Sequence, residues 1–164
     1  TASAGMFKGG LADDSKEVVK LHTTTHLLHA ALRKVLGESV AQKGSNITAE
    51  RLRFDFSHPN KLSDEEVEKV EDMVNEEIKK DLPVSFEIKS LKEALKEGAL
   101  AFFTEKYGKK VKVYKIGPST SSGSPFSMEI CGGPHVERTG EIGHARIVKQ
   151  EKIGSGVIRL YLTV

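Results

Sequence analysis

Two segments of the chain repeat inward-facing residues at steps of three or four, the spacing of one face of an α-helix. The first follows possible N-cap residues at positions 13–15 and ends at Gly37, and its stripe consists of Val18, Leu21, Thr25, Leu28, Leu32 and Val35. The second begins at a capping box formed by Ser63 and Glu66, and its stripe of Val67, Val70, Val74 and Ile78 stops before Pro83. The same capping spacing at Ser90 and Glu93 predicts a short third helix that ends or bends at Gly98.

Other segments alternate apolar and polar residues, which is typical of strands with one buried face. This pattern predicts strands within residues 51–56, 84–88, 111–116 and 126–130, and in the tail, 147–164, a turn at 154–156 followed by alternation over 158–164. In the first strand, Arg51 and Arg53 share the face expected to be exposed. Residues 117–125 are rich in Ser, Gly and Pro, and they predict a loop between strands rather than a domain linker.

Helices interspersed with half-buried strands favour an α+β fold, a mostly antiparallel β-sheet packed on one side by helices. The 164 residues fit one compact domain, residues 1–164, and the composition of 38% hydrophobic and 29% charged residues is typical of a globular protein. The pattern does not predict the order of the strands.

Charge and targeting signals narrow the classes of function. The 25 basic and 23 acidic residues leave a net charge of +2, so a nucleic-acid partner would have to bind local basic patches rather than a global field. The chain has no transmembrane run, and residues 1–10 lack the pattern of a signal peptide, so we expect a cytoplasmic protein. The single cysteine, Cys131, excludes an internal disulfide.

Two pairs of residues have the spacing of metal ligands. His22 and His26 are one helical turn apart, so their imidazoles lie on the same face and can converge on one ion. Cys131 and His135 are also four positions apart, and the two glycines between them allow a tight backbone path. Nitrogen and sulfur donors suit zinc better than magnesium or calcium, so the sequence predicts a zinc site between a helix and a Gly-rich loop.

Each pair also has a simpler interpretation, as hydrogen-bonded core histidines and a small buried cysteine. Zinc peptidase chemistry does not fit, because the general-base glutamate of the His-Glu-x-x-His motif is replaced by Thr23. Four protein ligands could also form a closed structural zinc site without an open coordination position. From the spacing alone, catalytic and structural zinc both remain open.

Several longer stretches carry a resemblance to a known family. They are the stretch Gly5-Met6-Phe7-Lys8-Gly9-Gly10-Leu11-Ala12-Asp13, residues 22–29, 42–45, 52–58, 98–100 and 105–108, and Cys131-Gly132-Gly133-Pro134-His135-Val136. In these stretches the sequence resembles the editing domains of alanyl-tRNA synthetases and, more distantly, a related domain of threonyl-tRNA synthetases and the free-standing deacylases similar to both. The resemblance covers nearly the whole chain.

The resemblance implies a role for individual residues. His22, His26, Cys131 and His135 match the ligands of the family's catalytic zinc. Thr25 matches a threonine that senses a serine side chain, and Gln42 matches a glutamine that lines the amino-acid pocket, so that Thr25, Gln42 and Cys131 make up the expected catalytic set. The chain departs from the family at Pro134, where threonine is usual, and at residues 158–160, where the family is more basic. His29, one turn beyond His26, could support a ligand, but we expect it to pack as a satisfied core histidine.

The function implied is zinc-dependent hydrolysis of mischarged tRNA(Ala), chiefly Ser-tRNA(Ala) and secondarily Gly-tRNA(Ala), as the proofreading part of an ATP-binding ligase. A pocket built for alanine cannot strongly reject serine, so a second, hydrolytic site is needed. The expected partners are the acceptor end of tRNA(Ala) and the rest of the synthetase, and residues 1–13 would be the entry segment of a part excised from it. Candidate phosphate contacts are Arg51, Arg53, Lys109, Lys110 and Lys112.

Two alternatives fit the same residues. A free-standing trans-editing deacylase would use the same chemistry in a separate polypeptide. A noncatalytic, zinc-stabilised tRNA-binding module would bind without turnover and would unfold when zinc is removed.

Overall fold

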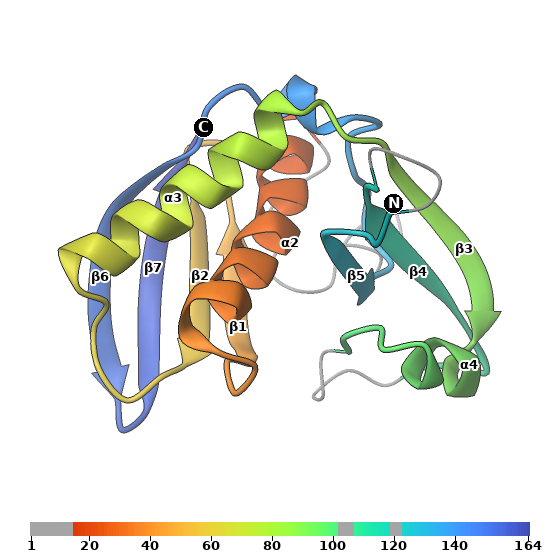
Figure 1. The fold of residues 1–164 in the computed structure, drawn as a ribbon, viewed down its shortest axis with the longest axis horizontal. Helices are drawn as coiled ribbons and strands as arrows, with labels where there is room; N and C mark the ends of the chain where they lie inside the picture. Colours follow the sequence, from red (N-terminus) through yellow and green to blue (C-terminus); the bar gives the residue numbers. More distant parts are fainter. Residues whose placement is uncertain (1–14, 102–106, 119–122) are drawn as a thin grey trace.

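The structure of the chain, a computed structural model, describes residues 15–101, 107–118 and 123–164. Its elements are α2 (Lys16–Leu36), β1 (Gln42–Ile47), β2 (Leu52–Ser57), α3 (Asp64–Lys79), β3 (Val84–Ser90), α4 (Leu91–Lys96), β4 (Lys110–Ile116), β5 (Ser127–Ile130), the 3-10 helix η1 (Thr139–Ile142), β6 (Arg146–Gly154) and β7 (Val157–Thr163). All named strand pairs are antiparallel. The predicted α+β class is therefore confirmed (Figure 1).

The strands form two sheets instead of the single sheet expected from the pattern. The larger sheet has the order β1-β2-β7-β6, and the smaller has the order β3-β4-β5. Strand β1 was not predicted, because its sequence, Gln-Lys-Gly-Ser-Asn-Ile, has no apolar alternation. Figure 1 shows the two sheets on opposite sides of α2, with α3 lying across the larger sheet.

The ends of the predicted helices are confirmed by their caps. The Ser15 hydroxyl accepts a hydrogen bond from the Val18 N–H, and α2 ends at Gly37, whose φ of 117° favours glycine. The capping box of α3 is complete, with the Ser63 and Glu66 side chains each accepting from the other residue's backbone N–H. The residues that start and stop the helices thus act through local backbone hydrogen bonds.

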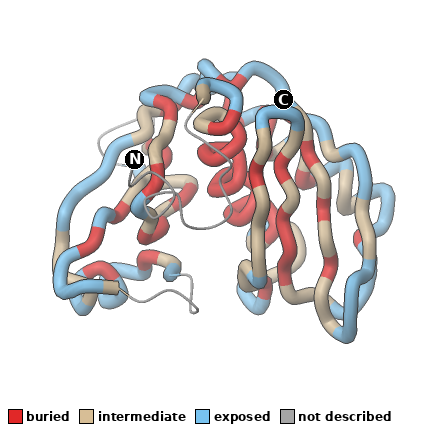
Figure 2. The backbone as a smooth tube through the Cα atoms, turned by 180° about the vertical axis from the view of Figure 1, so that it is seen from behind, coloured by how far each residue is buried: buried red, intermediate tan, exposed pale blue. Residues whose placement is uncertain are grey.

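The larger sheet buries one face against the helices. Phe54 of β2 lies opposite Leu160 of β7, and Phe56 lies opposite Ile158, and all four side chains are fully buried. Helices α2 and α3 cover this face with apolar residues that include Leu28. Figure 2 shows the resulting alternation of buried and less buried positions along these strands. The predicted period-two pattern of residues 51–56 therefore holds for the apolar side chains.

The opposite face of the larger sheet departs from the expectation of full exposure. Asp55 is buried there, because Arg159 of β7 donates two hydrogen bonds to its carboxylate, at 2.8 and 3.0 Å. Arg53 lies 3.5 Å from the same carboxylate and is only partly exposed. An ion pair across two strands thus covers a position that alternation alone assigns to solvent.

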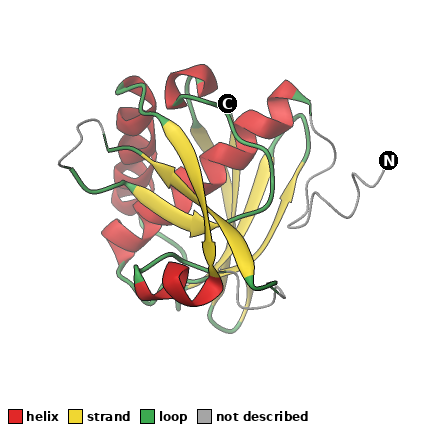
Figure 3. Ribbon diagram, turned by 90° about the vertical axis from the view of Figure 1, so that its right-hand side faces the viewer, coloured by secondary structure: helices red, strands yellow, loops and turns green. Residues whose placement is uncertain are grey.

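Helix α2 is buried on nearly all sides over residues 21–32, because it lies between the two sheets and beside α3. Three consecutive threonines, Thr23, Thr24 and Thr25, satisfy their hydroxyls by donating to the carbonyl oxygens four residues earlier. Viewed from the side of the smaller sheet, α2 and α3 lie behind it (Figure 3). This position lets α2 present polar side chains to a buried interface.

The smaller sheet packs against α4 through a separate apolar cluster that includes Ala94, Val113 and Ile130. The predicted loop at 117–125 contains a cis peptide bond between Gly117 and Pro118, and its residues 119–122 lie outside the described residues. The expected entry segment, 1–13, lies outside them as well. Among the described residues, no helix combines the length and apolar character needed to cross a membrane.

Candidate metal centre

Helix α2 and the segment after β5 bring together the four residues predicted as metal ligands. One ligand atom from each of His22, His26, Cys131 and His135 lies within 4.8 Å of the ligand atoms of the other three. We call these four residues the ligand cluster. The segment that carries Cys131 and His135 has neither helix nor strand and contains the two glycines of the motif. The structure therefore confirms that the two sequence pairs converge.

His22 is oriented by the loop itself. Its Nδ1 donates to the carbonyl oxygen of Pro134 at 2.7 Å, which leaves Nε2 at 3.4 Å from Sγ of Cys131. Only the carbonyl of residue 134 is used in this contact. A proline at this position can therefore orient His22 although it lacks a backbone N–H.

His26 is held by a carboxylate that the sequence interpretation did not include. Its Nδ1 contacts one oxygen of Glu129 on β5, and Nδ1 of His29 contacts the other oxygen at 2.8 Å. All three side chains are at least nine-tenths buried. His29 therefore supports a ligand, rather than only packing in the core as expected, because it holds the carboxylate that holds His26.

His135 is oriented by Thr23, which stands at the position of the missing peptidase glutamate. The Thr23 hydroxyl donates to the Val19 carbonyl, accepts from the Val136 N–H at 3.1 Å and lies 3.0 Å from Nδ1 of His135. All these groups are satisfied when Nδ1 of His135 carries the proton and donates to Thr23. The other ring nitrogen, Nε2, then has a free lone pair.

In all three imidazoles of the ligand cluster, Nδ1 is used by an oxygen and Nε2 points inward. Nε2 of His26 and Nε2 of His135 are buried and have no hydrogen-bond partner among the described residues. A buried ring nitrogen without a hydrogen-bond partner destabilises the folded state unless a ligand binds to it. Imidazoles fixed in this way by outer oxygens are typical of metal ligands, so the four residues could hold a metal ion.

The charges around the ligand cluster favour a cation. Burial acts to raise the pKa of the Cys131 thiol, yet the adjacent His22 and His26 hold that pKa well below its ordinary value. Burial also acts to raise the pKa of the Glu129 carboxyl, but the neighbouring His26 and His29 outweigh burial and hold that pKa below its ordinary value. The site therefore holds a thiolate and a carboxylate within a buried interface.

The two anions act in turn on His26. Burial lowers the pKa of this imidazole, but Glu129 and Cys131 outweigh the burial and raise the pKa to about 10. For His135 the balance is opposite, because burial and the neighbouring His22 lower its pKa to about 3. Nε2 of His26 thus attracts positive charge, which a proton or a metal ion can supply, while His135 offers a neutral donor.

The close approach of the loop to α2 requires a glycine at position 133. A Cβ atom added to Gly133 would lie 2.4 Å from Cε1 of His22, whereas one added to Gly132 would meet no atom within 4 Å. The two glycines of the motif therefore differ in role. Gly133 lets the backbone lie against a ligand ring, and Gly132 does not contact the cluster in this way.

The two residues expected to recognise the amino acid lie on neighbouring elements. Thr25 is buried on α2 and donates its hydroxyl proton to the Leu21 carbonyl at 3.0 Å. Gln42 is half-buried at the start of β1, where it pairs with Phe56. No described hydrogen bond joins either side chain to the ligand cluster, so their roles remain predictions.

The five candidate RNA contacts divide between the two sheets. Arg51 donates to the Asn46 carbonyl and Arg53 lies beside Asp55, both at the larger sheet. By contrast, Lys109, Lys110 and Lys112 are exposed and lie at or in β4 of the smaller sheet. The structure therefore does not place the five residues in one patch.

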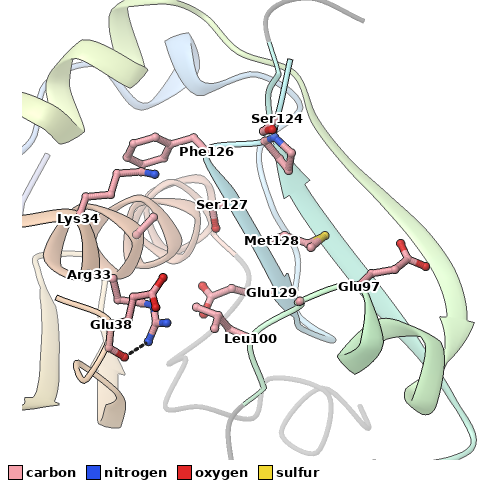
Figure 4. Close-up of a pocket in the computed structure, with 13 residues that line it drawn as sticks. Arg33, Lys34, Glu38, Glu97, Leu100, Ser124, Phe126, Ser127, Met128 and Glu129 are labelled. Carbon is pink, nitrogen blue, oxygen red and sulfur yellow. Dashed lines mark hydrogen bonds between the residues drawn. The ribbon is translucent and has the colours of Figure 1, made fainter. Parts of the chain in front are cut away.

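A pocket adjoins the ligand cluster through Glu129. Its cavity of about 520 Å³ lies between the C-terminal half of α2, strand β5 and the residues after α4. The residues that line it are Ala30, Arg33, Lys34, Glu38, Glu97, Gly98, Leu100, Ser124, Pro125, Phe126, Ser127, Met128 and Glu129. Figure 4 shows Glu129 beside Leu100, and Arg33 donating a hydrogen bond to the backbone carbonyl of Glu38. None of the four ligand-cluster residues lines this pocket.

Sequence reasoning missed Glu129 and Thr23, although both leave a signal in the sequence. Glu129 stands two positions before Cys131, so in an extended strand the two side chains share a face. Thr23 adjoins His22 and lies three positions before His26, but its contact with His135 depends on how the loop packs. The first residue could therefore have been predicted from period two, and the second could not.

Comparison with known proteins finds a family whose profile matches part of the chain. Residues 111–161 match the sequence profile of the family described as Threonyl and Alanyl tRNA synthetase second additional domain. This match includes Cys131, Glu129 and His135, whereas His22 and His26 lie before it. The ligand cluster therefore combines residues inside the matched region with residues outside it.

The chain is also similar to parts of several proteins named alanine–tRNA ligase. It is 58% identical over 158 residues to the one from Treponema denticola, a match that covers 96% of this chain and 25% of the relative. It is 51% identical over 145 residues to the one from Fervidobacterium nodosum, covering 88% of this chain and 16% of the relative. With the one from Rhizobium johnstonii it shares 46% identity over 170 residues, covering 98% and 19%. The chain thus spans about a quarter of the length of the first of these relatives and a smaller share of the other two.

Proposed function

Because the chain is homologous to a segment of the alanine–tRNA ligases and carries their second additional domain at residues 111–161, we propose that it is their editing domain. It would hydrolyse mischarged tRNA(Ala), chiefly Ser-tRNA(Ala) and secondarily Gly-tRNA(Ala), and would work in the cytoplasm with the rest of the synthetase. The observation that carries this proposal is the convergence of the inward Nε2 atoms of His22, His26 and His135 with Sγ of Cys131.

We further propose that the bound metal is zinc. Three imidazole nitrogens and one thiolate are the donors that zinc prefers, and the outer contacts from Pro134, Glu129 and Thr23 fix each imidazole in the ligating tautomer. When bound, zinc would supply Lewis-acid polarisation of a water molecule or of the ester carbonyl. The buried carboxylate of Glu129 would lower the net positive charge of the occupied site.

The reaction would be a simple ester hydrolysis. Water adds to the ester carbonyl, the bond to the ribose oxygen breaks, and the products are the free amino acid and uncharged tRNA. Glu129 is unsuited to be a free general base, because each of its oxygens already accepts from a histidine. This chain's residues would therefore contribute mainly by holding the site and excluding bulk water.

Selection of serine is proposed to depend on Thr25 and Gln42. Thr25 donates its own proton to the Leu21 carbonyl, so its oxygen is left as an acceptor for the hydroxyl proton of serine. Alanine has no hydroxyl and would leave that buried acceptor unpaired. A site of this kind prefers serine positively instead of only excluding larger residues.

Purified chain offered Ser-tRNA(Ala), Gly-tRNA(Ala) and Ala-tRNA(Ala) tests the proposal. We expect rapid release of serine, slower release of glycine and retention of alanine, with activity lost on chelation and restored by zinc. His22→Ala and His26→Ala should abolish release, whereas Glu68→Gln, an exposed change on α3, should not. Equal slow release from all three substrates would contradict the proposal.

The same assay separates the proposal from a closed structural zinc site, which four protein donors could also form. A structural site predicts that zinc-loaded chain binds tRNA without turnover. Chelation would then unfold the chain, as measured by circular dichroism, and no hydrolysis would be seen before or after chelation.

A further inference from the structure

One face of the smaller sheet is both apolar and exposed. Strand alternation and register place Phe86, Ile88, Lys110, Lys112 and Tyr114 on this side, and we call these five residues the Phe86 face. Phe86 is 47% exposed and Ile88 is 62% exposed. The other side of the sheet instead packs against α4. Val84 and Ile116 lie on the same side as Phe86 but pack in the main core, so the exposed part of this face is the end that carries Phe86 and Ile88. An exposed aromatic ring at this end suggests a binding surface.

The lysines on the two sides of this sheet differ in their partners. On the side that faces α4, Lys89 and Lys115 form ion pairs with Glu87, and Lys89 also pairs with Glu97. On the Phe86 face, neither lysine forms a salt bridge with a described residue. The Nζ atom of Lys112 lies over the ring of Phe86, 4.7 Å from its centroid. Within the part of the chain that the structure describes, positive charge thus lies beside an exposed ring without an acidic partner.

A continuous line of rings joins the Phe86 face to the ligand cluster. The Tyr114 ring lies 4.2 Å from the His135 ring, and the Phe86 ring lies 5.3 Å from the Tyr114 ring. From Tyr114 to Lys110 the strand extends about 13 Å, enough for only a few nucleotides. A ligand lying on this face would therefore have one end beside His135.

We propose that the Phe86 face binds the single-stranded 3′ end of an RNA, with a base stacked on Phe86 and phosphates beside Lys110 and Lys112. Exposed rings interleaved with lysines are the features that bind single strands, because every base has a face that can stack. The proposal rests on the proposed function, since this path would bring a 3′ ester to the ligand cluster. Arg51 and Arg53, on the larger sheet, have no part in it.

Binding of uncharged RNA tests this inference without requiring hydrolysis. The probes are a fluorescein-labelled RNA hairpin that ends in four unpaired 3′ nucleotides and the same hairpin with a flush end, measured by fluorescence anisotropy against the 164-residue chain. We expect tighter binding of the hairpin with the unpaired end. Phe86→Ala should weaken that binding about five-fold or more, and Phe86→Tyr, which keeps a ring, should preserve it.

Charge and control variants complete the test. Lys112→Gln should weaken binding and reduce the slope of log K against log salt by about 0.7, the value for one phosphate of a single strand. Leu95→Ala and Lys96→Gln change exposed residues of α4, on the other side of the sheet, and should bind as the unmodified chain does. Circular dichroism of each variant checks that it is folded.

The inference is wrong if Phe86→Ala and Lys112→Gln bind like the unmodified chain, or if the two hairpins bind equally. If this face instead contacts another part of a longer synthetase, the Phe86→Ala and Lys112→Gln variants should bind RNA as the unmodified chain does. If the unmodified chain hydrolyses Ser-tRNA(Ala) and the Phe86→Ala variant keeps full RNA affinity, the proposed function stands and this inference is overturned. If the chain binds the unpaired end through Phe86 but releases no serine, this inference stands and the proposed function is overturned.

Discussion

The carboxylate of Glu129 accepts a hydrogen bond from Nδ1 of His26, and this contact leaves Nε2 of the imidazole directed into the ligand cluster. The two residues are 103 positions apart in the chain. The second oxygen of the carboxylate is held by His29, so the carboxylate has little freedom to turn away. A ligand on α2 is thus oriented by a strand of the smaller sheet.

Replacing Glu129 with Gln should weaken metal binding. The amide keeps one acceptor oxygen but places an NH₂ group against one of the two histidines, so the network cannot remain intact. Loss of such an outer contact typically costs 10- to 100-fold in metal affinity, and we expect an effect in this range. Competition with a chromophoric zinc chelator measures it. Glu68→Gln serves as the exposed control, and equal affinities for the two variants would contradict the assigned role of Glu129.

Gly133→Ala should disturb the ligand cluster, whereas Gly132→Ala should not. The new Cβ at position 133 would lie 2.4 Å from the His22 ring, so the ring or the loop must move. We expect metal affinity to fall by about ten-fold or more, by analogy with the loss of an orienting contact. The Gly132 variant, whose Cβ meets no atom within 4 Å, should bind metal as before. Similar affinities in both variants would show that the loop adapts easily.

Asp55→Asn should destabilise the larger sheet. The substitution removes the charge that pairs with Arg159 and Arg53 in a largely buried setting, and we expect a loss of about 2–3 kcal/mol in the free energy of unfolding. Urea unfolding measures the change. In the control, Glu68→Gln changes an exposed residue of α3 and should change the free energy by less than about 0.5 kcal/mol. A comparable loss in both variants would refute the special contribution of Asp55.

Thr25→Val should reduce the preference for serine over alanine while leaving the metal bound. Valine keeps the shape of threonine but removes the oxygen proposed to accept the serine hydroxyl proton. Loss of one such buried hydrogen bond corresponds to about five-fold or more in the ratio of kcat/KM for serine to that for alanine. Deacylation of the two charged tRNAs, together with the zinc content of the variant, measures this. An unchanged ratio would remove Thr25 from the proposed role.

Local patterns along the sequence were sufficient for much of the fold. The period of the apolar stripes and the caps at Ser15, Ser63 and Ser90 predicted the three helices, because these signals act within one or two turns of backbone. The pairs His22–His26 and Cys131–His135 were predicted for the same reason, since spacing of four residues on a helix or across a tight loop limits where the side chains can point.

Only the tertiary structure decided how these local pieces combine. It divided the strands into two sheets, paired the unpatterned residues of β1 with β2, and buried Asp55 under Arg159. It also brought Glu129 to His26 and Thr23 to His135. These contacts join residues far apart in the chain, and their energy depends on burial and on the exact partner. Spacing along the chain puts Glu129 on the same strand face as Cys131, but it does not report that His26 is its partner, because that contact exists only after α2 is enclosed between the two sheets.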